Sequence, residues 1–118
     1  MNILGNALVV LVAVLHLYFL YLEMFMWTKP LGMKTFKNDA EFAKRSAVLA
    51  ANQGLYNGFL AAGLFWSVLA VEPMASSLKV FFLGCVIIAS LYGWYSVNKR
   101  IFFIQGIPAI IALIFCLI

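Results

Sequence analysis

Long apolar runs, separated by short polar segments, form the dominant pattern along the chain. A helix needs about 20 predominantly apolar residues to cross the hydrocarbon core of a bilayer. The first three runs meet this length, and the last is at its lower limit. The pattern therefore predicts an all-α integral membrane protein in which residues 1–118 form a single transmembrane domain, a four-helix bundle. The predicted spans are about 3–27, 47–71, 78–98 and 101–118.

The composition argues against a soluble protein. Of the 118 residues, 66% are hydrophobic and 10% are charged, whereas soluble domains are about 45–50% apolar and about 25% charged. A soluble fold of this length could not bury so much apolar surface, but in lipid that surface needs no cover. The first run has no Lys or Arg, so it lacks the basic start of a signal peptide. We therefore expect a multi-pass protein of the cell membrane, with the lipid bilayer as its partner.

Basic residues predict the topology. Segment 28–46 holds five Lys or Arg, turn 98–100 holds two, and Lys79 stands alone after segment 72–77. A chain that crosses four times places the two basic segments on one side, and the positive-inside rule makes that side cytoplasmic. The bundle is then up-down, with both termini on the non-cytoplasmic side. Because these bases form no stripe or groove-reading motif, the net charge of +4 predicts no nucleic-acid partner.

Turn residues predict where the first two helices meet. Pro30 and Gly32 favour an end to the first helix, since proline lacks an N–H group and glycine relaxes the backbone. The string Asn38-Asp39-Ala40-Glu41 is typical of a capping box. The second helix is therefore expected to begin near Asp39, with its first turns at the lipid headgroups.

Small residues four positions apart predict close helix packing. In lipid, helices associate mainly through van der Waals contact, which small residues permit. Such a stripe faces either a helix of the same chain or a second copy, so a homodimer and a monomer both stay open. The second span offers Gly54, Gly58 and Ala62, and the third offers Ala89 and Gly93.

Polar side chains inside the spans are costly and therefore informative. They concentrate in the predicted cytoplasmic half, whereas the outer half is nearly devoid of them. Together they predict a polar pocket that is open to the cytoplasm and binds a small ligand. The candidate residues are His16, Glu23, Asn52, Gln53, Tyr56, Asn57 and Gln105.

Each candidate also has a structural interpretation. Asn and Gln often bond helices together, for about 0.6–2 kcal/mol each. Glu23 could pair with Lys29, Arg45 or Arg100 as an anchor. His16 and Glu23 share a helix face but lie about 10 Å apart along the axis, so direct contact requires a bridging group.

Several chemistries lack the residues they need. One histidine does not supply a multi-histidine haem or zinc site, and Cys85 and Cys116 have no partner at metal or redox spacing. There is no phosphate-binding loop and no nucleophile elbow. We therefore expect no metal and no cofactor, while an acid–base pair of Glu23 and His16 stays open.

The polar motifs resemble a known family. The residues are His16, the run Glu23-Met24-Phe25-x-Trp27, the string Ala51-Asn52-Gln53-Gly54-x-Tyr56-Asn57-Gly58, and Gln105-Gly106-x-Pro108. They resemble, along the whole chain, small bacterial membrane proteins catalogued as a domain of unknown function. The resemblance implies a four-span membrane protein and supplies no substrate or reaction. Small multidrug exporters have a similar length and a membrane-embedded Glu in the first helix, but there the Glu is central, whereas here His16 holds that position.

Three functions are consistent with these residues. The first is a binding or transport protein that takes a small ligand, ion or amphiphile through the polar pocket. The second is a membrane enzyme acting on a lipid-soluble substrate, with His16 and Glu23 as acid and base. The third is a structural or accessory membrane subunit in which the amides only join helices. The asymmetric polar half favours the first.

Overall fold

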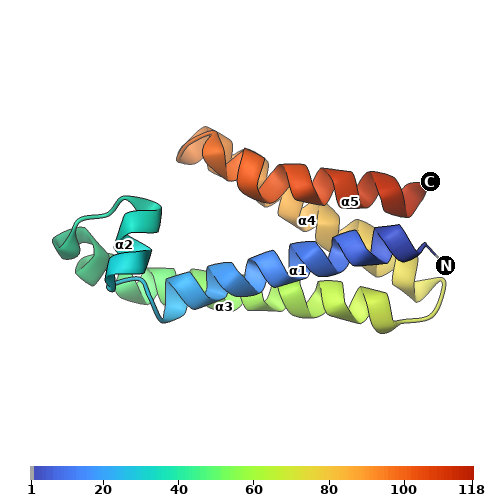
Figure 1. The fold of residues 1–118 in the computed structure, drawn as a ribbon, viewed down its shortest axis with the longest axis horizontal. Coiled ribbons are helices and arrows are strands. Elements are labelled where there is room, and N and C mark those ends of the chain that lie inside the picture. The colour runs from blue at the N-terminus through green and yellow to red at the C-terminus, as the bar shows by residue number, and fades with distance from the viewer. Residues whose placement is uncertain (1) are drawn as a thin grey trace. The chain divides into compact units, whose positions relative to one another are not determined.

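The computed structural model describes residues 2–118, and those residues form helices and no strand, as predicted for an all-α chain. Two helices, α1 and α4, are long and apolar enough to cross a membrane by length and composition. Helix α3 is longer, but Asn52, Gln53 and Asn57 lower its mean hydropathy, and the segment Phe102–Leu117 is apolar but shorter. The elements are α1 (Ile3–Met24), α2 (Pro30–Phe36), α3 (Ala40–Leu69), α4 (Met74–Ser96), η1 (Phe102–Gly106) and α5 (Ile107–Leu117) (Figure 1).

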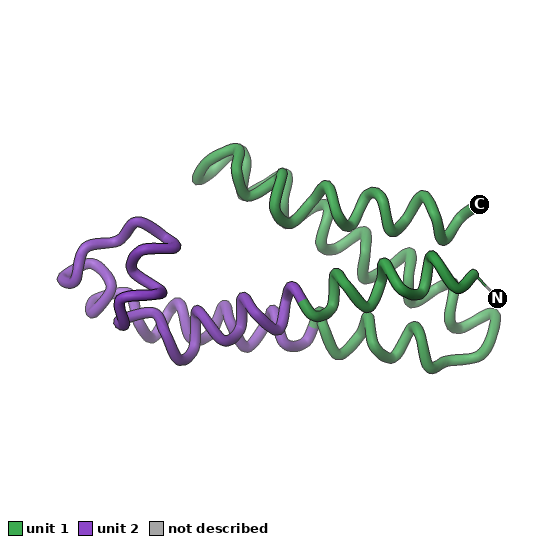
Figure 2. Tube along the Cα trace, viewed as in Figure 1, with its two compact units in different colours: residues 1–14, 60–118 green, residues 15–59 purple. Residues whose placement is uncertain are grey.

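The chain divides into two compact units (Figure 2). Unit 1 comprises residues 1–14 and 60–118, and unit 2 comprises residues 15–59. Helices α1 and α3 each contribute one part to unit 1 and one part to unit 2.

The core of unit 1 joins four helical segments. Close approach depends on small residues: a Cβ on Gly63 would lie 2.3 Å from the Phe82 ring, and one on Gly106 would lie 2.2 Å from Ser90 Oγ. At both positions an added side chain would force Phe82 or Ser90 to move, so glycine permits the observed packing. The buried core residues are Val9, Val12, Ala13, Ala61, Leu64, Leu83, Val86, Ala109 and Ala112.

The connection between α4 and α5 contains a π-helix, η1, that the sequence did not predict. The expected turn at 98–100 is present, and Asn98 Oδ1 accepts a hydrogen bond from the Arg100 N–H at 2.9 Å. After it, the N–H of Ile107 bonds to the carbonyl of Phe102, five residues earlier. Pro108 follows and has no N–H to continue the α-helical ladder, which favours such an irregular turn.

Unit 2 begins its long helix where the sequence predicted, but with a different cap. Helix α3 starts at Ala40, and Asp39 Oδ1 accepts a hydrogen bond from the Phe42 N–H at 2.8 Å. The cap is therefore Asp39, so Asn38 and Glu41 do not form the expected capping box. Helix α2 was also not predicted, because Pro30 was interpreted only as a stop, whereas here it opens a short helix.

Candidate functional site

A buried carboxylate held by two amides is the most distinctive polar feature of unit 2. Glu23 lies in the last turn of α1 and is 3% exposed. The Asn57 side-chain amide donates to Glu23 Oε1 at 2.5 Å, and the Gln53 amide donates to Oε2 at 2.5 Å. Because Gln53 and Asn57 are four positions apart on α3, they face the same side of that helix. Two of its turns therefore present one donor to each oxygen.

Glycines on α3 bring this helix close enough to α1 for these bonds. A Cβ on Gly54 would lie 2.7 Å from Met24 Cγ and 3.2 Å from the Leu20 carbonyl oxygen. A Cβ on Gly58 would lie 2.7 Å from Leu20 Cδ1. The stripe of small residues thus packs against α1 of the same chain, and it positions the amides beside Glu23.

The partners of Glu23 satisfy its oxygens without balancing its charge. Hydrogen bonds to an ionised carboxylate are strong, but Asn and Gln side chains are neutral. A charge buried without a counter-charge stays costly even when it is hydrogen-bonded. The anchoring role considered from the sequence, pairing with Lys29, Arg45 or Arg100, is not what these contacts show. Neutralising this carboxylate requires a proton or a cation.

His16 lies in the part of α1 that belongs to unit 2. Its side chain is fully buried, and its ring meets the Phe19 ring edge-on, with centroids 5.3 Å apart. An aromatic neighbour and full burial suit a packed position on α1 rather than a surface that a substrate reaches directly.

The remaining candidates do not join the Glu23 cluster in unit 2. Asn52 is exposed and donates to the Val48 carbonyl of its own helix at 3.2 Å, and Tyr56 is 62% exposed. Gln105 lies in η1 and belongs to unit 1.

Three other positions were predicted to pack closely against a helix, and only one of them lies at a close contact. Ala62 and Ala89 have exposed side chains, so the stripes do not continue through them. Gly93 does lie at a close contact, because a Cβ there would be 2.6 Å from Ile101 Cγ2.

One polar contact of unit 2 was missed by the sequence analysis. Trp27 Nε1 donates to Ser46 Oγ at 3.0 Å, and the Trp27 ring lies 4.8 Å from the Phe36 ring. Together these contacts join the start of α3 to α2. The signal that could have found this contact is the indole N–H of Trp27, a donor that needs an acceptor where it is partly buried.

Among residues 2–118, no group of three His, Cys, Asp or Glu side chains could hold a metal ion. Oxygen and amide groups are thus the chemistry that the Glu23 site offers. It can hold a proton or a small cation, and it can donate hydrogen bonds through α3.

These features define an all-α protein with two helices apolar enough to cross a membrane and a buried carboxylate–amide site. The chain belongs to the family described as "Protein of unknown function (DUF1304)", whose model matches residues 10–117. It is 34% identical over 116 residues to "Uncharacterized protein YpaA" of Lactococcus lactis subsp. lactis (strain IL1403), covering 97% of each chain. No solved structure matches it significantly. The polar motifs had indicated a resemblance to a family of unknown function, and membership of such a family is confirmed.

Proposed function

We propose that this protein is a four-span membrane protein that binds a small cation or cationic amphiphile at Glu23, in exchange for a proton. The observation that supports the proposal is the pairing of the Glu23 carboxylate with two neutral amides, Gln53 and Asn57. The partners beyond the ligand are the lipid bilayer and, as a further part of the proposal, a second copy of the chain.

The chemistry of exchange follows from this environment. A carboxylate in an apolar surrounding is stabilised either by a proton or by a bound cation. Binding of one therefore displaces the other at a single group. The amides from α3 hold the carboxylate in place in both states, because each can present either its N–H group or its oxygen after rotating.

A flux measurement tests the exchange. The protein is reconstituted into liposomes containing a pH-sensitive dye, and ethidium is added as the probe cation. We expect ethidium movement in one direction to be coupled to proton movement in the opposite direction in the wild type, and Glu23→Gln to abolish the coupled signal. The matched control is Glu41→Gln, an exposed acid in the first turn of α3. Coupled flux that survives Glu23→Gln unchanged would refute the exchange.

The four-span topology has its own test. With Cys85 and Cys116 replaced by serine, single cysteines are placed at Lys37, Lys99 and Ser77, and intact cells are treated with an impermeant thiol reagent. We expect labelling at 77 alone, because 28–46 and 98–100 are predicted to face the cytoplasm. Labelling of 37 and 99 on opposite sides of the membrane would contradict the topology.

A structural subunit is the second candidate, and the glycine contacts favour it. Gly54 and Gly58 let α3 touch Leu20 and Met24 of α1, which packing alone could require. In that case Glu23→Gln should preserve function in cells, since glutamine retains the hydrogen bonds, whereas Gly58→Leu should abolish it. The two candidates thus give opposite results for Glu23→Gln.

A further inference from the structure

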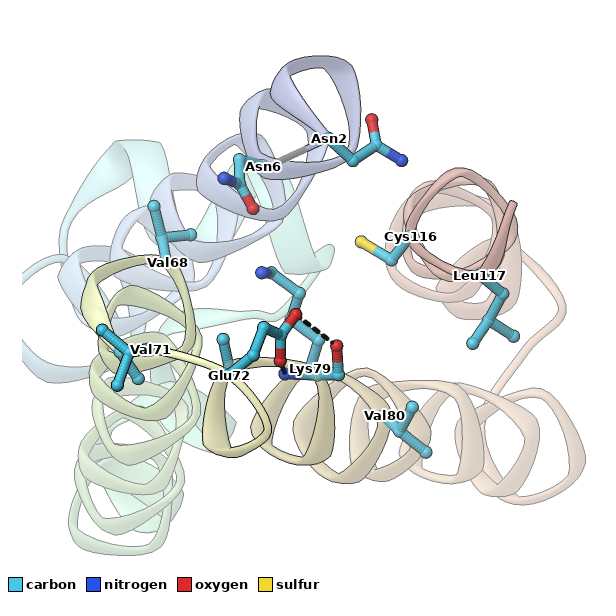
Figure 3. A pocket seen from close by; sticks show the side chains of 12 residues that line it. Asn2, Asn6, Val68, Val71, Glu72, Lys79, Val80, Cys116 and Leu117 are labelled. Atoms are coloured by element: carbon cyan, nitrogen blue, oxygen red, sulfur yellow. Dashed lines mark hydrogen bonds between the residues drawn. The ribbon is translucent and has the colours of Figure 1, made fainter.

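Unit 1 contains a cavity of about 370 Å³ in which side chains from four helical segments meet (Figure 3). It lies where the start of α1, the end of α3, the start of α4 and the end of α5 come together. Its volume is at the lower end of the range for small-molecule sites, about 300–1,000 Å³. The residues of the Glu23 cluster do not line it, so it is a separate site.

Two opposite charges line this cavity. Lys79 is half-buried, and its side chain extends from α4 into the space between Asn6 and Cys116 (Figure 3). Glu72 comes from the connection before α4. Seven of the eight bases of the chain lie in segments 28–46 and 98–100, so Lys79 is the one outside them.

Ser76 fixes the position of the Glu72 carboxylate. Its N–H group donates to Glu72 Oε1 at 2.9 Å, and its hydroxyl donates to Oε2 at 2.6 Å. The hydrogen bond from the Ser76 hydroxyl is the largest effect that lowers the pKa of Glu72, and the bond from the Ser76 N–H group is the second. The positive charge of Lys79 lowers this pKa further. The carboxylate is therefore ionised and held at the cavity, with lone pairs still free to accept from a ligand.

The other walls are suited to a ligand with both polar and apolar parts. Asn6 supplies an amide that can donate or accept, while Val68, Val80 and Leu117 supply apolar surface. Glu72 precedes α4 and Lys79 lies in its second turn, so the two charges come from different turns of the chain. This arrangement suits a ligand whose own two charges are separated by several bonds.

We propose that this cavity binds a zwitterionic phosphoethanolamine group, with its ammonium on Glu72, its phosphate on Lys79 and any attached alkyl part against Val68, Val80 and Leu117. The same chemistry exists in a free phosphoethanolamine and in the headgroup of a membrane lipid. The inference rests on the cavity alone and does not depend on exchange at Glu23.

Calorimetric titration of the detergent-purified full chain tests the site with three probes: O-phosphoethanolamine, dihexanoyl phosphatidylethanolamine and dihexanoyl phosphatidylglycerol. The last keeps the phosphate and lacks the ammonium. We expect the ethanolamine lipid to bind about tenfold more tightly than the glycerol lipid, from one hydrogen-bonded charge contact. If the ligand is the headgroup of a membrane lipid, the ethanolamine lipid should bind more tightly than O-phosphoethanolamine. If the ligand is free phosphoethanolamine, these two probes should bind equally.

Charge-removing variants complete the test. Lys79→Gln should weaken every probe by about tenfold, since each carries a phosphate. Glu72→Gln should remove the preference for ethanolamine while leaving phosphate binding in place. Leu117→Trp should fill the cavity and block all three probes, and the controls Lys99→Gln and Glu41→Gln should bind like the wild type. Wild-type binding to none of the probes, no preference for the ethanolamine lipid, or unchanged binding in Lys79→Gln would each overturn the proposal.

Discussion

Glu23 in unit 2 and Glu72 in unit 1 show two ways in which this chain holds a carboxylate. Glu23 is buried, and its donors are amides of a different helix, Gln53 and Asn57. Glu72 is exposed, and its donors both come from Ser76, four residues later. A contact between distant segments stabilises tertiary structure, whereas a local contact mainly orders one helix start. Substitutions should therefore disturb unit 2 through Glu23 far more than unit 1 through Glu72.

The largest effect is expected where the two helices of unit 2 touch. Gly54→Leu places a side chain where even a Cβ lies 3.2 Å from the Leu20 carbonyl oxygen, so α1 and α3 must separate. We expect about 3 kcal/mol of lost stability or more, measured by unfolding in SDS followed by circular dichroism. Ala62→Leu on the exposed face of the same helix is the control. Equal stability of the two variants would show that the close approach of α1 and α3 contributes nothing.

Removing the buried carboxylate itself should cost somewhat less. Glu23→Ala deletes two hydrogen bonds and leaves the buried Asn57 amide without its acceptor, a loss of about 2 kcal/mol. Glu23→Gln keeps the shape and can bond to both amides, so its loss should stay below about 1 kcal/mol. The same SDS titration compares the two. If Glu23→Gln loses as much stability as Glu23→Ala, the negative charge of Glu23 itself stabilises unit 2. The interpretation that hydrogen bonds to two neutral amides hold this side chain would then be wrong.

A smaller difference is expected between two asparagines of α3. Asn57→Ala removes a donor to Glu23 and should cost about 1 kcal/mol. Asn52→Ala removes only a bond to the Val48 carbonyl of its own exposed helix face, and the better helix propensity of alanine should offset that loss. Thermal unfolding of both variants in one detergent measures the difference. Equal melting temperatures would mean that the interhelical bond has no more value than the local one.

Much of the fold could be predicted because it depends on local pattern. The apolar runs predicted the helices, and Asp39 predicted where α3 begins, since both signals lie in consecutive residues. Helix α2 was missed because Pro30 was interpreted only as a stop, and η1 was missed because the effect of Pro108 on the preceding turn was not considered. Packing that the sequence does not reveal also contributes, since Gly32 lies in α2 where a Cβ would be 1.9 Å from the Met26 carbonyl oxygen.

The candidate site could be predicted only in part. Polarity at the predicted membrane depth drew attention to Glu23, Gln53 and Asn57, whose side chains are joined by hydrogen bonds. The same polarity also suggested Asn52 and Tyr56, which lie on exposed faces. The depth of a residue along a helix does not tell which way its side chain points around the helix axis. Only the packing of α3 against α1 distinguishes Gln53 and Asn57 from Asn52 and Tyr56. The Glu72 cavity was missed because its residues lie in four distant segments.

The smallest predicted effect concerns the pH dependence of Glu72. Its pKa in the folded protein is lower than the ordinary 4.5, because Ser76 donates to it. A group whose folded pKa is depressed adds stability above its unfolded pKa and loses it as the pH falls through the folded value. The melting temperature of the wild type should therefore fall towards that of Glu72→Gln only below about pH 4.5. Ser76→Ala should reduce the difference in melting temperature between Glu72 and its glutamine variant. Ser77 is the exposed neighbour of Ser76, and Ser77→Ala should leave that difference unchanged. A wild-type advantage that stays constant down to about pH 3 would show that Glu72 gains nothing from Ser76.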